Sequence, residues 1–254
     1  MEEALVTAPS KDASLTPSKE ASLTPPSMYS WRVAALRTWL GEKSKGGAAI
    51  TMEMLNTAGH LDQLHYQGVR ANDDIITLLQ VRAEDRLLDV GSGLGGPARY
   101  IASKTGCSVD GFDIQEDLVE EASKVAGLVG LAGRVRFTTT DASSPEFAAT
   151  VARTPGGSYD AHYSILVNLH IPRAPRAAMF ANIGRAVKET GAIVIEDYVL
   201  RTDEPLLEEE LRQLRDIVGV AYLPTKQEYK VTWNNLAPFN PCSGAAGGGW
   251  VCGG

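Results

Sequence analysis

Short apolar runs alternate with longer segments of mixed polarity through residues 87–218. The apolar runs predict buried β-strands, and they cover residues 87–90, 108–114, 134–139, 161–167 and 192–198. Each run is followed by a segment that predicts a helix, and these segments cover residues 98–104, 116–128, 145–153, 174–188 and 208–218. Strands that alternate with helices through short connections predict an α/β fold with a doubly wound, mostly parallel sheet. In such a sheet, ligands bind beyond the carboxyl ends of the strands.

Composition divides the chain into segments around this α/β core, which we place at residues 81–201. Residues 1–28 are rich in Ser, Thr and Pro, and we expect a disordered tail because such a segment buries little apolar surface. Helical patterns predict an N-terminal helical cap segment at residues 29–80 and a C-terminal helical segment at residues 202–239. Residues 240–254 are Gly-rich and show no strand pattern, so we expect a second disordered tail there.

Charge and cysteine content narrow the function classes. The formal net charge of −7 disfavours nucleic acid as a partner, because phosphate binding needs a basic surface. The three cysteines show no metal-ligand spacing, which predicts no metal site and suits a reducing compartment. No apolar run approaches the roughly 18 residues of a membrane span, and the N-terminus resembles neither a signal peptide nor a transit peptide. We therefore expect a cytoplasmic protein without a membrane span.

The stretch 87–100 predicts a buried strand, a glycine turn and the start of a helix. Its glycines include Gly91, Gly93 and Gly96, which also fit the dinucleotide pattern G-x-G-x-x-G. Asp89, two residues before the first of these glycines, argues against a dinucleotide because a carboxylate there would repel a pyrophosphate. It suits a ligand that bears an ammonium group. An NAD-dependent oxidoreductase stays a weaker alternative.

Two further acidic residues end predicted strands. Asp113 lies about twenty residues beyond Gly93, at a distance where a carboxylate accepts hydrogen bonds from both hydroxyls of a ribose. The alternative is an ordinary strand-terminal or helix-capping acid. Asp141 ends the third predicted strand, where it can contact a ligand, cap the following helix, or do both.

His170 and Tyr66 are the candidate catalytic residues. His170 lies just beyond the fourth predicted strand, where it can act as a general base or orient a substrate, although a loop histidine is as often structural. Tyr66 and His65 belong to a polar, aromatic segment that can close over the site, and packing alone explains Tyr66 equally well.

The form D-x-G-x-G-x-G-G at Asp89–Gly96 resembles motif I of the class I S-adenosyl-L-methionine (SAM) methyltransferases, whose fold is Rossmann-like. The resemblance extends over about residues 62–198. Within the class, the sequence is similar to the branch that acts on small molecules. This branch includes sarcosine/dimethylglycine, phosphoethanolamine, sterol and tocopherol methyltransferases. The segments 62–68 and 222–225 most resemble sarcosine/dimethylglycine N-methyltransferase-like proteins.

The resemblance implies SAM as the cofactor and assigns roles to residues. The glycine loop would contact the methionine part of SAM, Asp89 its amino group, Asp113 the ribose, and Asp141 with Ala142 the adenine. The segment Gln63–Tyr66 would cover the cofactor. The complete set of expected cofactor-binding residues is Gln63, Tyr66, Asp89, Gly91, Ser92, Gly93, Asp113, Ile114, Asp141, Ala142 and Asn168.

The same resemblance implies methyl transfer to a small-molecule acceptor, with an amine of the sarcosine/dimethylglycine type favoured. A sterol- or tocopherol-type C-methyltransferase and a phosphoethanolamine N-methyltransferase are alternatives. By the same resemblance, the family fold ends in an antiparallel hairpin of two strands, and the Gly-rich C-terminus shows no pattern that predicts such strands. A sheet without that hairpin would leave an apolar edge, so a catalytically weak, truncated interaction protein is an alternative of another class.

Overall fold

The computed structural model describes residues 28–200, 204, 206–229, 243–244 and 250–253. The tail expected at residues 1–28 lies outside the described residues except for Met28. Residues 230–239, which end the expected C-terminal helical segment, also lie outside them.

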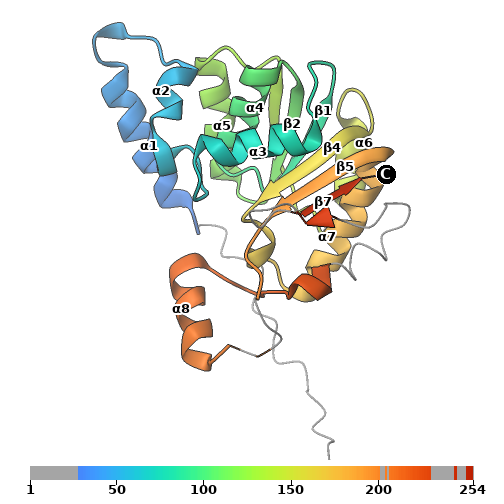
Figure 1. Cartoon of the computed structure of the whole chain (residues 1–254). Coiled ribbons are helices and arrows are strands. Elements are labelled where there is room, and N and C mark those ends of the chain that lie inside the picture. The colour runs from blue at the N-terminus through green and yellow to red at the C-terminus, as the bar shows by residue number, and fades with distance from the viewer. Residues whose placement is uncertain (1–27, 201–203, 205, 230–242, 245–249, 254) are drawn as a thin grey trace, which may run out of the picture.

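The described strands form one sheet in the order β3-β2-β1-β4-β5-β7-β6, and the first five run parallel (Figure 1). Their bounds are Arg86–Val90 for β1, Ser108–Asp113 for β2, Val135–Thr139 for β3, Tyr159–Ile165 for β4 and Val187–Glu196 for β5. The doubly wound α/β architecture is therefore confirmed. The order changes direction at β1 and β4, the switch point beyond which such sheets bind ligands.

The expectation of a missing C-terminal hairpin is wrong. Of the Gly-rich tail expected at residues 240–254, the structure describes residues 243–244 and 250–253, and these form strands. Strand β7 (Trp250–Gly253) pairs antiparallel with β5, and β6 (Ser243–Gly244) pairs antiparallel with β7. An edge strand such as β5 offers a row of unpaired backbone N–H and C=O groups, which an extended segment can join whatever its side chains. The backbone groups make this pairing, so the Gly-rich composition did not indicate it.

Helices cover both faces of the sheet (Figure 1). Those that follow the strands are α4 (Gly96–Thr105), α5 (Glu116–Leu128), α6 (Glu146–Arg153), α7 (Arg173–Ala186) and α8 (Glu208–Val218). Ahead of the sheet lie α1 (Ser30–Lys43), η1 (Lys45–Gly47), α2 (Met52–Asn56), η2 (Gly59–Leu61) and α3 (Val69–Leu79). Helix α8 stands apart from the sheet and buries none of its residues.

The α7–β5 boundary differs from the sequence prediction, which continued the helix to residue 188. Val187 instead begins β5, because its backbone pairs with Tyr159 at the start of β4. At the other end, β4 stops at Ile165, and Leu166 has a φ of 53°, a conformation unusual for a residue with a side chain. The chain therefore leaves the sheet sharply beside the switch point.

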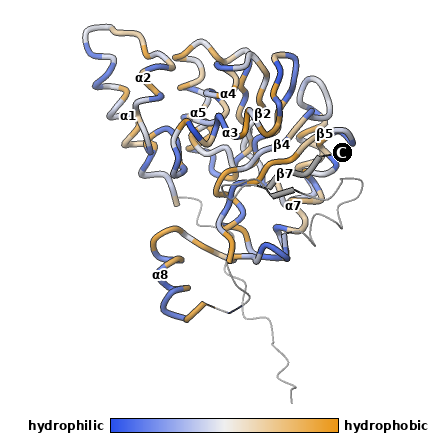
Figure 2. Tube along the Cα trace, viewed as in Figure 1, coloured by the Kyte–Doolittle hydropathy of each residue, from blue (hydrophilic) through white to orange (hydrophobic). Residues whose placement is uncertain are grey.

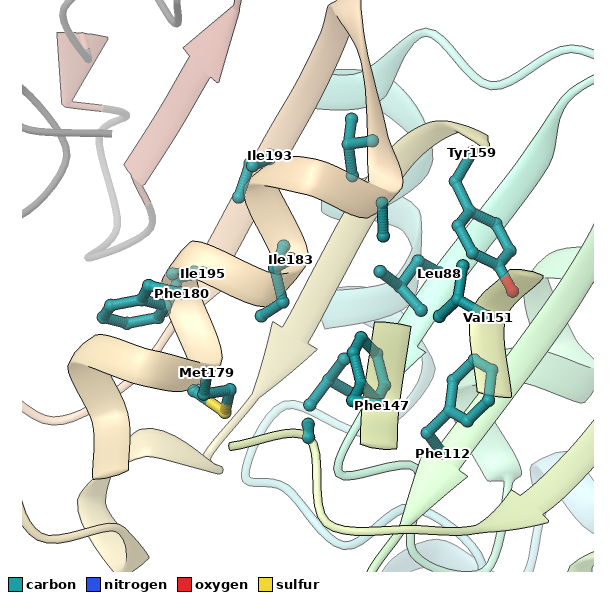
Figure 3. Close-up of a cluster of buried hydrophobic side chains, with 14 of the residues drawn as sticks. Leu88, Phe112, Phe147, Val151, Tyr159, Met179, Phe180, Ile183, Ile193 and Ile195 are labelled. Carbon is teal, nitrogen blue, oxygen red and sulfur yellow. The ribbon is translucent and has the colours of Figure 1, made fainter. Parts of the chain in front are cut away.

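Apolar side chains fill the layers on both faces of the sheet. One cluster joins β1, β2 and β5 to α6 and α7, and part of it is drawn in Figure 3. Its Phe112 and Phe147 rings pack edge to face with centroids 5.2 Å apart. A second cluster packs α3, α4 and α5 on the opposite face, and a third lies under α1 and α2. Figure 2 shows apolar positions running along β5, which lies between these layers.

The described residues show neither a helix that could span a membrane nor a cluster that could bind a metal. Within these ranges, no helix is both long and apolar enough to cross a bilayer. Nor do the described residues bring together three or more His, Cys, Asp or Glu side chains in a way that could hold a metal ion.

Candidate cofactor and acceptor site

The glycine loop after β1 forms the floor of the site, and two glycines there are required by close contacts. Gly91 has a φ of 77°, and a Cβ at this position would clash with the side chain of Val167. A Cβ at Gly96 would clash with the backbone carbonyl of Asp62. Residues with side chains at these two positions would displace Val167 or the segment around Asp62.

A cavity of about 590 Å³ opens at the carboxyl ends of the strands. This volume is typical of a small-molecule or cofactor site. Most of the site residues expected from the sequence line it, namely Tyr66, Gly91, Gly93, Asp113, Ile114, Asp141, Ala142 and His170. The folded chain thus brings together side chains from the segment before α3 and from the ends of four strands.

A second cavity of about 40 Å³ lies at the same glycine loop, and Asp89 and Ser92 are among its lining residues. The Tyr163 hydroxyl donates a hydrogen bond to the Asp89 carboxyl over 3.0 Å. Burial raises the pKa of Asp89 to about 7, and the Tyr163 hydrogen bond only partly opposes this effect. A cation that reached this carboxyl would favour its ionised form.

Asp113 and Asp141 present carboxylates at neighbouring strand ends. Asp113 accepts hydrogen bonds from the backbone N–H of Gly93 over 2.8 Å and of Gln115 over 2.9 Å. Each carboxylate oxygen retains a lone pair for a ligand hydroxyl. Burial is the main cause that raises the pKa of Asp113. Asp141 accepts from the backbone N–H and the hydroxyl of Ser143, so it closes a turn ahead of α6 instead of capping that helix.

Gln63 and Asn168, which the sequence also assigns to the cofactor, do not line either of these two cavities. Both are buried. The Gln63 side chain is held by hydrogen bonds with Asp62, His65 and Asn72. The backbone of Asn168 donates to the Asp197 carboxyl over 2.6 Å. The Gln63 amide is therefore held by buried neighbours, and the contact of Asn168 with Asp197 is made by its backbone.

His170 ends the short helix η3 (Asn168–His170) at the rim of the larger cavity. Its Nδ1 lies 3.0 Å from the carbonyl oxygen of Gly219, and its Nε2 lies 3.2 Å from the hydroxyl oxygen of Tyr29. Burial lowers the pKa of His170, which favours the neutral ring. A carbonyl only accepts hydrogen bonds, so Nδ1 of the neutral ring carries the proton and Nε2 accepts from Tyr29.

The sequence interpretation missed several residues that line the larger cavity. Tyr29, Trp31 and Arg32 come from the start of α1 and its approach, and Ile217 comes from the end of α8. Only the fold brings the start of α1 and the end of α8 to the carboxyl ends of the strands. Tyr198 could have been found, because it ends the predicted strand at residues 192–198, two residues beyond the end of β5, and the same strand-end rule applies. Its ring lies 5.9 Å from that of Tyr66.

Residues 87–191 match the family model described as a methyltransferase domain. Methyltransferase GfsG of Streptomyces halstedii is 30% identical over 141 residues, which cover 56% of this chain and 48% of that protein. Phosphoethanolamine N-methyltransferase of Plasmodium falciparum is 30% identical over 132 residues, which cover 52% and 46%. Sterol 24-C-methyltransferase erg-4 of Neurospora crassa is 26% identical over 136 residues, which cover 53% and 34%. The match therefore spans less than half the length of these relatives.

Solved structures share the fold. Phosphoethanolamine N-methyltransferase 2 of Haemonchus contortus, in complex with phosphomonomethylethanolamine and S-adenosylhomocysteine, has a TM-score of 0.61 at 22% identity, over 82% of this chain and 45% of that one. The cyclase SpnF also has a TM-score of 0.61, at 20% identity, over 86% of this chain and 74% of that one. Because a cyclase shares the fold, the fold alone does not identify a reaction.

The family match and the relatives indicate that residues 87–191 form a class I SAM-dependent methyltransferase domain. This confirms the class expected from the glycine motif. The cofactor of this class is S-adenosyl-L-methionine, as the sequence predicted.

Proposed function

We propose that this protein transfers a methyl group from SAM to a small-molecule acceptor, with an amine as the favoured acceptor. The observation that supports this most is the set of carboxyl groups at three neighbouring strand ends: Asp89, Asp113 and Asp141 line the two cavities that meet at the glycine loop. Bound SAM supplies an electrophilic methyl group. Asp113 would hold the ribose, Asp141 with Ala142 the adenine, and Asp89 the amino group.

The pair formed by Tyr29 and His170 offers a place for the proton of an amine acceptor. Nε2 of neutral His170 accepts a hydrogen bond from the Tyr29 hydroxyl, while the Nδ1–H donates to the carbonyl of Gly219. The Tyr29 oxygen can therefore take a proton from an acceptor nitrogen and pass its own proton to Nε2. His170 would act through Tyr29 as the general base.

Aromatic side chains around the larger cavity favour an amine, because their faces attract cations. Tyr66 and Tyr198 stack at a tilt with ring centroids 5.9 Å apart, and both line this cavity. Sarcosine-type and phosphoethanolamine-type amines both fit this surface.

Location in the cytoplasm remains a prediction from the sequence.

A sterol- or tocopherol-type acceptor is the second candidate, because the cavity also carries exposed apolar side chains. Trp31 is 61% exposed and Ile217 is 79% exposed, and both line the larger cavity. Such a rim suits the apolar body of a lipid ring. By contrast, the pairing of β7 with β5 removes the bare sheet edge that suggested an interaction protein.

A direct assay separates these functions. The full chain is incubated with SAM and a panel of secondary amines, phosphoethanolamine, sterols and phenols, and release of S-adenosylhomocysteine is measured. Turnover of an amine supports the favoured acceptor, and turnover of a sterol alone supports the second candidate. Binding of NAD in place of SAM, or SAM binding without turnover of any acceptor, would contradict the proposal. Glu120→Ala, a change on the exposed face of α5, serves as a control that should keep wild-type turnover.

A further inference from the structure

The small cavity beside the glycine loop contains polar atoms that lack a partner. Among the described residues, no hydrogen-bond partner reaches Nδ1 of His65 or Oγ of Ser92, and both residues line this cavity. The Asp89 carboxyl lines it as well. Buried polar atoms are nearly always paired in folded proteins. Two unpaired atoms on residues that line a single cavity therefore point to a ligand.

Hydrogen bonds behind the cavity fix which nitrogen of His65 can accept. The Asp62 carboxylate can only accept, so the Gln63 atom 3.1 Å from it is the amide nitrogen. The other end of that amide is consequently the oxygen Oε1, which lies 3.0 Å from Nε2 of His65. Nε2 must donate this bond, and Nδ1 of the neutral ring is left as an unprotonated acceptor.

The same hydrogen bonds hold the acceptor in place. The Arg99 guanidinium, buried in α4 just after the glycine loop, forms an ion pair with the Asp62 carboxylate. Asn72 of α3 donates a second hydrogen bond to Gln63 Oε1 over 2.9 Å. Every member of this chain of contacts is buried, and His65 is only 3% exposed. The ring of His65 is thus fixed by groups on both flanking helices.

The character of the cavity indicates a small cation. Its volume of about 40 Å³ admits a group of roughly the size of one or two water molecules. No Lys or Arg lines it, so an anionic group would face the Asp89 carboxylate without compensation. A primary ammonium group has three N–H bonds, which matches the three acceptors on Asp89, Ser92 and His65.

We propose that Nδ1 of His65 completes, with Asp89 and Ser92, a three-acceptor seat for the α-ammonium group of SAM. This inference rests on the proposed function and names one residue that binds the cofactor's amino-acid arm. The two cavities share the lining residues Leu64, His65, Gly91, Gly93 and Ile165. An amino-acid arm that follows the glycine loop from the larger cavity therefore reaches the smaller one.

A matched pair of variants tests the role of His65. His65→Leu removes the acceptor, whereas His65→Asn has nearly the same shape as Leu and can place an amide oxygen near the position of Nδ1. The full-length proteins are titrated calorimetrically with S-adenosylhomocysteine and with 5′-methylthioadenosine, which lacks the amino-acid arm. We expect His65→Leu to weaken S-adenosylhomocysteine binding about tenfold to hundredfold, the usual effect of losing a hydrogen bond to a charged group. His65→Asn should recover most of this loss, and neither change should alter methylthioadenosine binding.

The two ligands separate a failure of this inference from a failure of the proposed function. If His65→Leu weakens both ligands alike, or weakens neither, His65 does not bind the ammonium group and the inference is overturned. If the wild-type protein binds neither ligand, the proposed function fails together with it.

A measurement on the wild-type protein covers the case in which the variants do not fold. The chain has four histidines, so their ring nitrogens can be followed by ¹⁵N NMR. Nδ1 of His65 should resonate as an unprotonated nitrogen and shift on addition of S-adenosylhomocysteine, but not on addition of methylthioadenosine. A protonated Nδ1, or the same response to both ligands, would overturn the inference.

Discussion

Cofactor binding at Asp89 should depend on pH, because the free protein holds this carboxyl in an unfavourable environment. Asp89 is buried at the end of β1, and burial raises its pKa to about 7. A bound ammonium group requires the ionised carboxylate and so lowers this pKa. Binding below pH 7 must therefore release a proton, and affinity falls as the pH drops.

The size of this effect follows from the pKa of the free protein. If the pKa in the complex lies well below 6, the dissociation constant for S-adenosylhomocysteine rises about eightfold between pH 7.5 and pH 6.0, or about 1.2 kcal/mol. Near pH 6 about 0.9 proton is released for each ligand bound. His65 does not interfere, because burial lowers its pKa to about 4 and the ring stays neutral over this range.

Calorimetric titrations in buffers of different ionisation enthalpy measure both the affinity and the released protons. Asp89→Asn keeps the shape of the side chain but cannot ionise, so its weaker affinity should not change between these pH values. A flat affinity in the wild-type protein, or a pH dependence that persists in Asp89→Asn, would refute the role given to Asp89.

Three further substitutions test other parts of the site. Gly96→Ala should destabilise the fold by about 1–3 kcal/mol and weaken cofactor binding, because the new methyl group meets the Asp62 carbonyl. The control Gly127→Ala, with no atom near the added methyl group, should be neutral or stabilising. Equal losses of stability for the two variants in denaturant melts would contradict this expectation. Asp62→Ala leaves the buried Arg99 charge unpaired and should cost about 3–5 kcal/mol in chemical unfolding, so a loss below about 1 kcal/mol would show that the pair is not buried in solution. Tyr29→Phe should lower kcat for an amine about 100-fold or more and leave S-adenosylhomocysteine affinity unchanged, and an unaltered kcat would exclude this hydroxyl from proton transfer.

The α/β core could be predicted from the sequence because its signals are local. Apolar runs and amphipathic segments gave α5 and α8 with the observed bounds, Glu116–Leu128 and Glu208–Val218. That Asp113 and Asp141 line one cavity could be predicted, because parallel strands end at one edge and residues at strand ends meet in space. Position along the chain was enough to place them.

Long-range contacts could not be predicted in this way. Tyr29 and His170 are 141 residues apart, and nothing in either neighbourhood indicates that they meet. The pairing of β7 with β5 uses backbone groups, which composition does not reveal. Gln63 was assigned to the cofactor because of its place in the covering segment, but its amide faces buried neighbours. Side-chain direction within a loop depends on the tertiary structure.

Binding of S-adenosylhomocysteine to the wild-type chain and to Asp113→Ala tests the central claim most directly. The Asp113 carboxylate would accept two ribose hydroxyls, and the loss of both hydrogen bonds should weaken binding roughly 100-fold. Isothermal titration of the full-length wild-type protein should show one site, and Asp113→Ala should show this loss. Equal affinity in the two proteins, or a wild-type protein that binds NAD but not S-adenosylhomocysteine, would contradict the account.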